Sequence, residues 1–421
     1  MMTSFTHPLT GDVIYRMTHP SGLDILVWPQ ENACAAYASF ATRYGSVNNC
    51  LPTADGIEQV PAGIAHFLEH KLFESEDGDA FTRYAATGAS ANAYTSFNRT
   101  AYIFHATDNI LPSLEILLDF VQHPYFTEET VQKEQGIIGQ EIRMGEDEPS
   151  QRVLYNMLEG MYHTHPVRID IAGTVESISH ITADLLYRCY HQYYNLHNMA
   201  LVVAGKITPE EVEALADRLL IPAVPFTRFT AETTEPSDVA ERYVEAVMPV
   251  AAPLFMLGFK EPADTMRDAV AMAAGEMLPV LIAGDSSDLY ADLMARGLIN
   301  SSFSAEYFNG SDYGMWLFEG ESSDPRAVED AIVAEITRLQ RDGIDPTRVE
   351  QVRRSVYGML VKKMDDPTEC AELLMGHILD NLEPLSLLDA VAAITAAELT
   401  DHLRRRVATN TRTLSVVRPQ G

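Results

Sequence analysis

Residues 63–70 read Gly-Ile-Ala-His-Phe-Leu-Glu-His, and this octapeptide decides what kind of protein the chain forms. On a helix, His66 and His70 lie one turn apart and share a face. Glu69 lies about 100° from His70 around the helix axis, beside the same face. Two imidazoles at this spacing can bind one Zn²⁺, and a neighbouring carboxylate can hold its water molecule. The alternative is a polar helix face with two hydrogen-bonded histidines and no metal.

A catalytic zinc site usually has three protein ligands, so a further ligand must come from elsewhere in the chain. Residues 134–143 read EQGIIGQEIR and have a helical pattern. Glu134 and Glu141 lie two turns apart on such a helix, about 10 Å along its axis, and share a face. One of them can bind zinc while the other supports a histidine ligand from behind. Without further information, acidic residues at this spacing also fit a solvated helix face.

The chain is predicted to be a tandem repeat of two halves. Residues 221–238 contain three prolines and several threonines, which favours an extended linker near the midpoint. The sequence Ile-Thr-Ala occurs at residues 181–183 and again at 394–396, each time before a helical pattern and an apolar strand. In both places the threonine can cap the helix. We therefore expect an N-terminal zinc-binding half (1–220), a linker (221–240) and a degenerate C-terminal half (241–421).

Each half mixes strands and helices without strict alternation, which favours α+β halves with sheets flanked by helices. The expected strands include residues 24–28, 36–43, 199–204, 244–250 and 413–417. The expected long helices cover residues 111–121, 127–144, 264–283 and 327–340.

Composition excludes several classes of function. The 421 residues are 46% hydrophobic, which is long enough for two cores. Thirty basic residues against 60 acidic residues give a formal net charge of -30, which disfavours nucleic-acid binding. We find no run of 18 apolar residues, so no membrane span is expected, and the N-terminus lacks the pattern of a secretory signal. The four scattered cysteines predict buried free thiols in a reducing cytoplasm.

Five stretches of the chain resemble the pitrilysin/insulinase family, which includes the mitochondrial processing peptidases and smaller bacterial relatives. They are residues 63–73 (GIAHFLEHKLF), 88–102 (GASANAYTSFNRTAY), 134–143, 165–178 (HPVRIDIAGTVESI) and 287–298 (SDLYADLMARGL). The resemblance implies that His66, His70 and Glu141 bind one zinc ion per chain. It also implies that Glu69 activates the water molecule and that Glu134 orients a ligand.

The resemblance also suggests how substrate binds. Residues 91–96 alternate like a strand, and an edge strand at this place would pair with the substrate backbone. Asn92, Ala93 and Tyr94 are then the expected contacts, with Asn92 nearest the scissile bond. The other reading is an ordinary strand within a sheet.

The second half contains no HxxEH sequence, and the resemblance implies that it closes a chamber around the single metal. Arg296 is its candidate for contacting substrate. Many relatives place a tyrosine shortly after the Arg-Gly-Leu turn, whereas this chain has Asn300. Tyr307 or Tyr313 would then have to substitute.

The sequence thus predicts a zinc-dependent endopeptidase that cleaves unfolded peptides. The acidic charge suggests a preference for basic peptides. A chain of this length in the family often pairs, so we expect a homodimer or a heterodimer with a related chain. One alternative is a catalytically inactive or structural subunit of such a heterodimer, and another is a zinc-binding structural domain without hydrolase activity.

Overall fold

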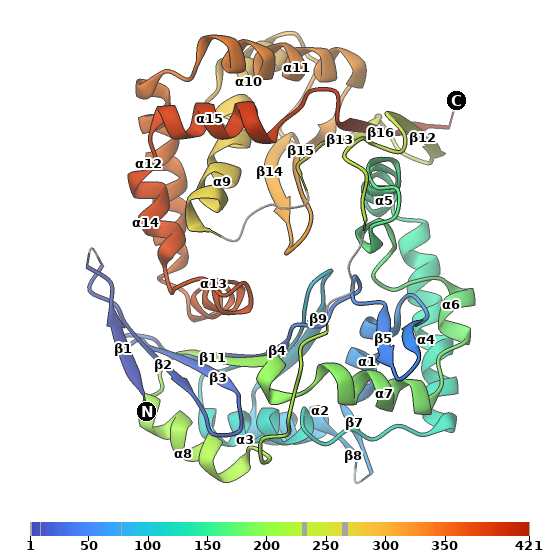
Figure 1. Ribbon diagram of the computed structural model, residues 1–421, viewed down its shortest axis with the longest axis vertical. Helices are drawn as coiled ribbons and strands as arrows, with labels where there is room; N and C mark the ends of the chain where they lie inside the picture. Colours follow the sequence, from blue (N-terminus) through green and yellow to red (C-terminus); the bar gives the residue numbers. More distant parts are fainter. Residues whose placement is uncertain (1, 9, 77, 230–233, 263–267, 421) are drawn as a thin grey trace. The chain divides into compact units, whose positions relative to one another are not determined.

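The computed structural model describes residues 2–8, 10–76, 78–229, 234–262 and 268–420, which fall into two compact units (Figure 1). Unit 1 contains Met1–Ile142, Asp170–Glu232 and Val361–Leu385. Unit 2 contains Arg143–Ile169, Thr233–Leu360 and Ser386–Gly421. The units differ from the continuous halves expected from the sequence, because each includes one segment from the other half of the chain.

Unit 1 is built on a seven-stranded sheet of order β1-β2-β3-β11-β4-β10-β9. The strands are Thr3–Thr6, Val13–Thr18, Asp24–Pro29, Met199–Gly205, Ala36–Thr42, Thr100–Ala106 and Ser90–Thr95, in that order. Every residue of the apolar strands β11 and β4 is buried, so the centre of the sheet is covered on both faces. β9 lies at one end of the sheet, as expected for residues 91–96.

Most helices of unit 1 pack with the sheet into one apolar core. These helices are α1 (Ile64–Leu72), α2 (Ala80–Thr87), α3 (Ile110–Phe120), α4 (Glu128–Glu146), α6 (Val175–Ser179), α7 (Ala183–Tyr193) and α8 (Pro209–Leu219). The short hairpin β5-β6 (Cys50–Thr53, Gly56–Gln59) precedes α1 in the sequence, and the hairpin β7-β8 (Glu74–Ser75, Gly78–Asp79) lies between α1 and α2.

The remaining helix of unit 1, α13 (Pro367–Leu379), comes from the second half of the chain and lies on β11 and β4 (Figure 1). Arg43 donates hydrogen bonds to the carbonyl oxygens of Ile378 and Leu379 at 2.7 and 2.9 Å. These bonds satisfy carbonyl groups that the helix end leaves unpaired. Glu372 accepts a hydrogen bond from the Tyr37 hydroxyl at 2.9 Å, which fixes the middle of the helix to β4.

Unit 2 repeats the arrangement on a five-stranded sheet of order β12-β16-β13-β15-β14. Its strands are Tyr243–Met248, Arg412–Pro419, Leu254–Lys260, Gly314–Glu321 and Ser304–Asn309 in that order. In both sheets one parallel pair, β3-β11 or β12-β16, is followed by three antiparallel pairs in the same order. This correspondence, strand for strand, supports the predicted α+β halves related by duplication.

The helices of unit 2 are α5 (Pro149–Met161), α9 (Ala269–Ala283), α10 (Asp288–Ala295), α11 (Pro325–Asp342), α12 (Pro346–Lys363), α14 (Ser386–Ala393) and α15 (Ala396–Arg406). α5 comes from the first half of the chain and packs on β16 and β13, as α13 packs on β11 and β4. The two halves therefore exchange equivalent helices. Thr182 and Thr395 cap α7 and α15 through their hydroxyl groups, which confirms the predicted caps.

Two other sequence predictions are corrected or refined by the structure. One helical stretch, Ala269–Ala295, is long and apolar enough to count as a candidate membrane span, with mean hydropathy 1.3 and half of its window buried. The stretch is divided into α9 and α10, and α9 packs in the core of unit 2, so it is weak evidence for a span. All four cysteines are free thiols, but Cys34 is exposed rather than buried.

Candidate metal centre

Helix α1 begins where the backbone at Gly63 packs against the backbone at Ala172. Gly63 precedes the helix with φ 91°, and a Cβ at this position would lie 2.3 Å from the carbonyl oxygen of Ala172. Glycine is therefore required both for the left-handed backbone and for the close approach. Phe67 and Leu68 are completely buried in the core of unit 1, which turns the histidine face of α1 the other way.

Three potential metal ligands converge on that face. The Nε2 atoms of His66 and His70 lie 3.5 and 3.6 Å from the two carboxylate oxygens of Glu141 on α4. The three ligand atoms lie within 4.8 Å of one another. Zinc with ligands at about 2.1 Å in a tetrahedron separates them by about 3.4 Å, so this donor set fits the metal. The Glu141 side chain is 51% exposed, which leaves the cluster open on one side.

Glu134 lies behind His70 rather than in the cluster. Its Oε1 atom is 3.0 Å from His70 Nδ1, and its side chain is buried. This bond directs His70 Nε2 toward Glu141, as carboxylates do for metal-binding histidines. Burial disfavours the ionised form of Glu134, but the hydrogen bond and charge of His70 offset it and keep the Glu134 pKa below its ordinary value.

His66 is buried more deeply than His70. Burial and the neighbouring His70 lower the pKa of His66 to about 4, so its imidazole is neutral near pH 7. Its Nδ1 atom is buried and has no hydrogen-bond partner among the described residues. A neutral ring protonated at Nδ1 presents a free lone pair at Nε2, which is the form that a metal binds.

Glu69 lies beside the cluster and is 8% exposed. Burial raises the pKa of Glu69 to about 7, although His70 and a hydrogen bond from Thr95 act against this rise. The Thr95 hydroxyl donates to Glu69 Oε2 at 3.0 Å. A carboxyl group whose pKa lies near neutrality can both accept and return a proton. We did not anticipate Thr95 from the sequence, although strand alternation places it on the same face as Ala93.

The expected substrate residues Asn92, Ala93 and Tyr94 lie on β9, the strand whose Thr95 contacts Glu69. Asn92 is exposed, and its side-chain oxygen accepts a hydrogen bond from the backbone N–H of Ala93 at 2.9 Å. Tyr94 lies on the opposite face of β9 from Thr95 and donates its hydroxyl proton to Glu372. Tyr94 is thus engaged in holding α13 to the sheet.

The second-half candidates belong to unit 2, whereas the metal cluster lies in unit 1. Arg296 follows α10 and forms an exposed ion pair with Asp292 at 3.0 Å. The Tyr307 hydroxyl bonds to Glu261 at 3.1 Å, and Tyr313 is only 2% exposed. A role of Arg296, Tyr307 or Tyr313 at the metal cluster therefore stays a prediction from the family resemblance.

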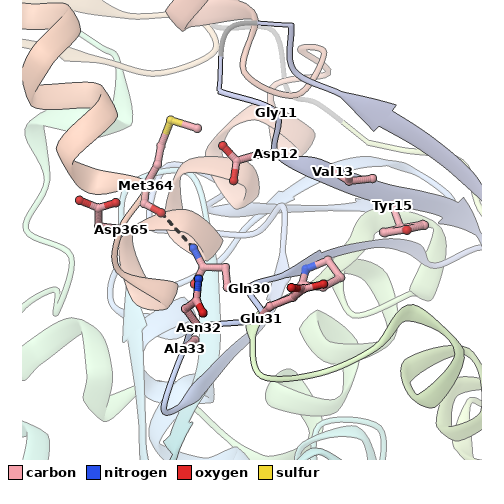
Figure 2. A pocket seen from close by; sticks show the side chains of 11 residues that line it. Gly11, Asp12, Val13, Tyr15, Gln30, Glu31, Asn32, Ala33, Met364 and Asp365 are labelled. Atoms are coloured by element: carbon pink, nitrogen blue, oxygen red, sulfur yellow. Dashed lines mark hydrogen bonds between the residues drawn. The ribbon is translucent and has the colours of Figure 1, made fainter.

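A separate cavity of about 490 Å³ lies in unit 1 and shares no residue with the metal cluster (Figure 2). It is bordered by the carboxyl groups of Asp12, Glu31 and Asp365. Two of its lining residues are joined by a hydrogen bond, which the Gln30 amide donates to the carbonyl oxygen of Met364 at 2.9 Å (Figure 2). This cavity is not the candidate active site.

Comparison with known proteins identifies the family of this chain. The family model described as "Insulinase (Peptidase family M16)" matches residues 58–175, and the model "Peptidase M16 inactive domain" matches residues 180–356. The chain belongs to the pitrilysin/insulinase family of peptidases, family M16. All five clustered residues, His66, Glu69, His70, Glu134 and Glu141, lie within the stretch that matches the insulinase model.

Individual relatives match nearly the whole chain. A Bacillus subtilis protein described as uncharacterized zinc protease YmfH is 36% identical over 421 residues, which cover 97% of each protein. A protein of Arabidopsis thaliana described as probable mitochondrial-processing peptidase subunit beta is 24% identical over 94% of this chain and 77% of its own length. The crystal structure of an M16-like peptidase from Alicyclobacillus acidocaldarius has a TM-score of 0.92 and 32% identity, covering 99% of this chain and 100% of that chain.

Proposed function

We propose that this chain is a zinc-dependent endopeptidase that hydrolyses peptide bonds in unfolded peptides. The observation that carries the proposal is the convergence of His66 Nε2, His70 Nε2 and the Glu141 carboxylate, with buried Glu69 beside them. Membership of the M16 family and a 36% identical relative described as a zinc protease support it.

In the proposed reaction, His66, His70 and Glu141 hold the metal, and Glu134 keeps the His70 ring in position. Zinc, when bound, lowers the pKa of a water molecule and polarises a scissile carbonyl group. Glu69 accepts the proton of the attacking water and passes it to the leaving amine. Because water is the nucleophile, no acyl-enzyme forms. The edge strand β9 would hold an extended peptide by backbone pairing, with Asn92 and Ala93 among the contacts.

The choice of substrate and the assembly belong to the same proposal. A net charge of -30 favours basic peptides, in which case kcat/KM for a basic peptide should fall with rising salt more steeply than for a neutral one. We further propose a cytoplasmic enzyme that works as a homodimer or with a related chain. The Arabidopsis relative is itself described as a subunit. Enclosure of the peptide by the second half, with Arg296 as a contact, stays a prediction from the family resemblance.

The proposal is tested by zinc analysis together with cleavage of an unstructured peptide library. The wild-type chain should carry one zinc ion and cleave peptides, and the His66→Ala, His70→Ala double variant should lose both. Glu69→Gln should retain zinc and fold while kcat falls by about 10²–10⁴-fold. Bound zinc with no cleavage in the wild type would favour an inactive subunit or a structural zinc domain. Near-normal turnover in Glu69→Gln would exclude Glu69 as the base.

A further inference from the structure

Strand β9 is attached to helices on both of its faces. Ala91 and Ala93 pack against the core of unit 1, and Thr95 continues that face and reaches Glu69 on α1. Tyr94 lies on the other face, and its hydroxyl donates to Glu372 on α13 at 2.5 Å. Neighbouring residues thus fix the end of β9 between α1 and α13, which leaves the Thr95 hydroxyl little freedom to move.

The direction of the Thr95 hydrogen bond follows from counting protons. Thr95 Oγ1 lies 3.0 Å from Glu69 Oε2 and 3.4 Å from Thr100 Oγ1. The Thr100 hydroxyl donates its single proton to the carbonyl oxygen of Tyr44 at 2.8 Å, so its oxygen can only accept from Thr95. The shorter distance and the negative charge direct the Thr95 proton to Glu69, because bonds to ionised acceptors are the stronger ones.

Glu69 has no other hydrogen-bond donor in the described part of the chain, and the residue is only 8% exposed. A buried carboxylate oxygen without a donor is costly, so the bond from Thr95 selects the orientation of the side chain. Glu69 Oε2 faces Thr95 on β9, and Glu69 Oε1 has no hydrogen-bond donor among the described residues.

We propose that Thr95 is a positioning residue for Glu69, holding one carboxylate oxygen so that the other is presented to the attacking water. This inference rests on the proposed function, in which Glu69 is the general base. Displacement of a catalytic group by about 1 Å can cost about a hundredfold in rate, so a residue that fixes the group acts on kcat without touching the peptide. Because Thr95 ends the strand expected to pair with substrate, it also links that strand to the base.

Two substitutions separate a positioning role from a structural one. Thr95→Val keeps the β-branched shape and removes the hydroxyl, whereas Thr95→Ser keeps the hydroxyl. We expect Thr95→Val to lower kcat about tenfold to a hundredfold, the range for losing one hydrogen bond to a charged group. KM, bound zinc and the melting temperature should remain near wild type. Thr95→Ser should recover most of kcat, and the control Thr82→Val, which makes the same change at an exposed position of α2, should match wild type.

A second comparison uses the Glu69→Gln background. If Thr95 acts through Glu69, adding Thr95→Val to Glu69→Gln should not lower the residual kcat further. The double variant should also bind an uncleaved peptide with the same affinity as Glu69→Gln, as measured by fluorescence anisotropy. Provided that the wild type is active, three outcomes would overturn this proposal. They are a full kcat in Thr95→Val, equal losses of kcat in the valine and serine variants, and a rise in KM without a change in kcat. An inactive wild-type chain would overturn the proposed function as well.

Discussion

At the scale of single residues, the two histidines of α1 are held differently. His70 Nδ1 has a buried carboxylate partner in Glu134, whereas His66 Nδ1 has none among the described residues. The orientation of His66 must therefore come from packing on a buried helix face, and that of His70 from a charged hydrogen bond. The less buried histidine is the one that needs the bond, because fewer neighbours restrict its ring.

This difference predicts a specific effect of replacing Glu134. Glu134→Gln removes the charge behind His70 and should weaken zinc binding by about 10- to 100-fold, the usual cost of losing such a partner. Competition with a chromophoric chelator measures the affinity. Glu129→Gln changes an exposed carboxylate on the same helix and should leave it unchanged. Equal zinc affinities in the two variants would show that Glu134 does not support His70.

At the scale of elements, the start of α1 is fixed by a reciprocal contact with the segment before α6. A Cβ on Gly63 would meet the carbonyl oxygen of Ala172, and a Cβ on Gly173 would lie 2.4 Å from the carbonyl oxygen of Ala62. Ser177 also donates a hydrogen bond to that oxygen at 2.8 Å. The metal-binding helix is thus positioned by backbone contact with a segment about 110 residues away in the chain.

We predict that Gly63→Ala lowers the free energy of unfolding by about 2–4 kcal/mol, since it combines a strained backbone with a clash. Displacing α1 should also reduce zinc occupancy. Gly136→Ala is the matched control, because Gly136 lies within α4 and no atom would meet its Cβ within 4 Å. That variant should be neutral or more stable by up to about 1 kcal/mol. Chemical denaturation and zinc analysis test both, and an undisturbed Gly63→Ala variant would contradict the packing argument.

The end of the linker is anchored in unit 2 by a buried ion pair. Glu235 accepts hydrogen bonds from the backbone N–H groups of three successive residues, 163–165, and from Lys260 Nζ at 2.7 Å. Burial opposes ionisation of Glu235. These donors outweigh it and lower the Glu235 pKa from its ordinary 4.5 to about 2.

A carboxyl group whose pKa is lower in the folded state stabilises the fold above its unfolded pKa and loses this effect as the pH falls. Glu235→Gln should therefore destabilise unit 2 by about 3–5 kcal/mol at pH 7, because it leaves Lys260 buried without a counter-charge. The difference from wild type should shrink between pH 4.5 and pH 2. Urea unfolding from pH 7 to pH 3 measures this, with the exposed Glu241→Gln as control. A difference that does not vary with pH would contradict the ion-pair argument.

At the scale of the whole molecule, each sheet is completed by a helix from the other half of the chain. α13 covers β11 and β4, and α5 covers β16 and β13. All residues of β11 and β4 are buried only because α13 is present on one face and the other helices on the other. The chain therefore cannot be divided at its linker without exposing an apolar sheet face.

This exchange predicts the behaviour of a fragment comprising residues 1–220. Because the fragment lacks α13, it should bind a hydrophobic dye and unfold without a sharp transition. Addition of a peptide comprising residues 361–385 should suppress dye binding and restore part of the cooperativity. Fluorescence titration and thermal unfolding measure both effects. A 1–220 fragment that melts as sharply as the full chain would show that α13 is dispensable.

Local patterns in the sequence determined those features that depend on neighbouring residues. The one-turn spacing of His66 and His70 places both imidazoles on one face of any helix, whatever surrounds it. The caps at Thr182 and Thr395 likewise depend on residues three positions away. The duplication could be predicted because the Ile-Thr-Ala segments at 181–183 and 394–396 and the proline-containing linker between them are local patterns as well.

Only the tertiary structure decided which distant groups meet. Residue spacing alone did not distinguish the roles of Glu134 and Glu141. The packing of α4 against α1 places Glu134 at His70 Nδ1 and Glu141 at the Nε2 atoms of His66 and His70. The bond from Thr95 to Glu69 and the placement of α13 on the opposite half's sheet likewise carry no local signal. Such contacts depend on how apolar faces fit across long stretches of chain. Periodicity marks a face as apolar without specifying which other face will cover it.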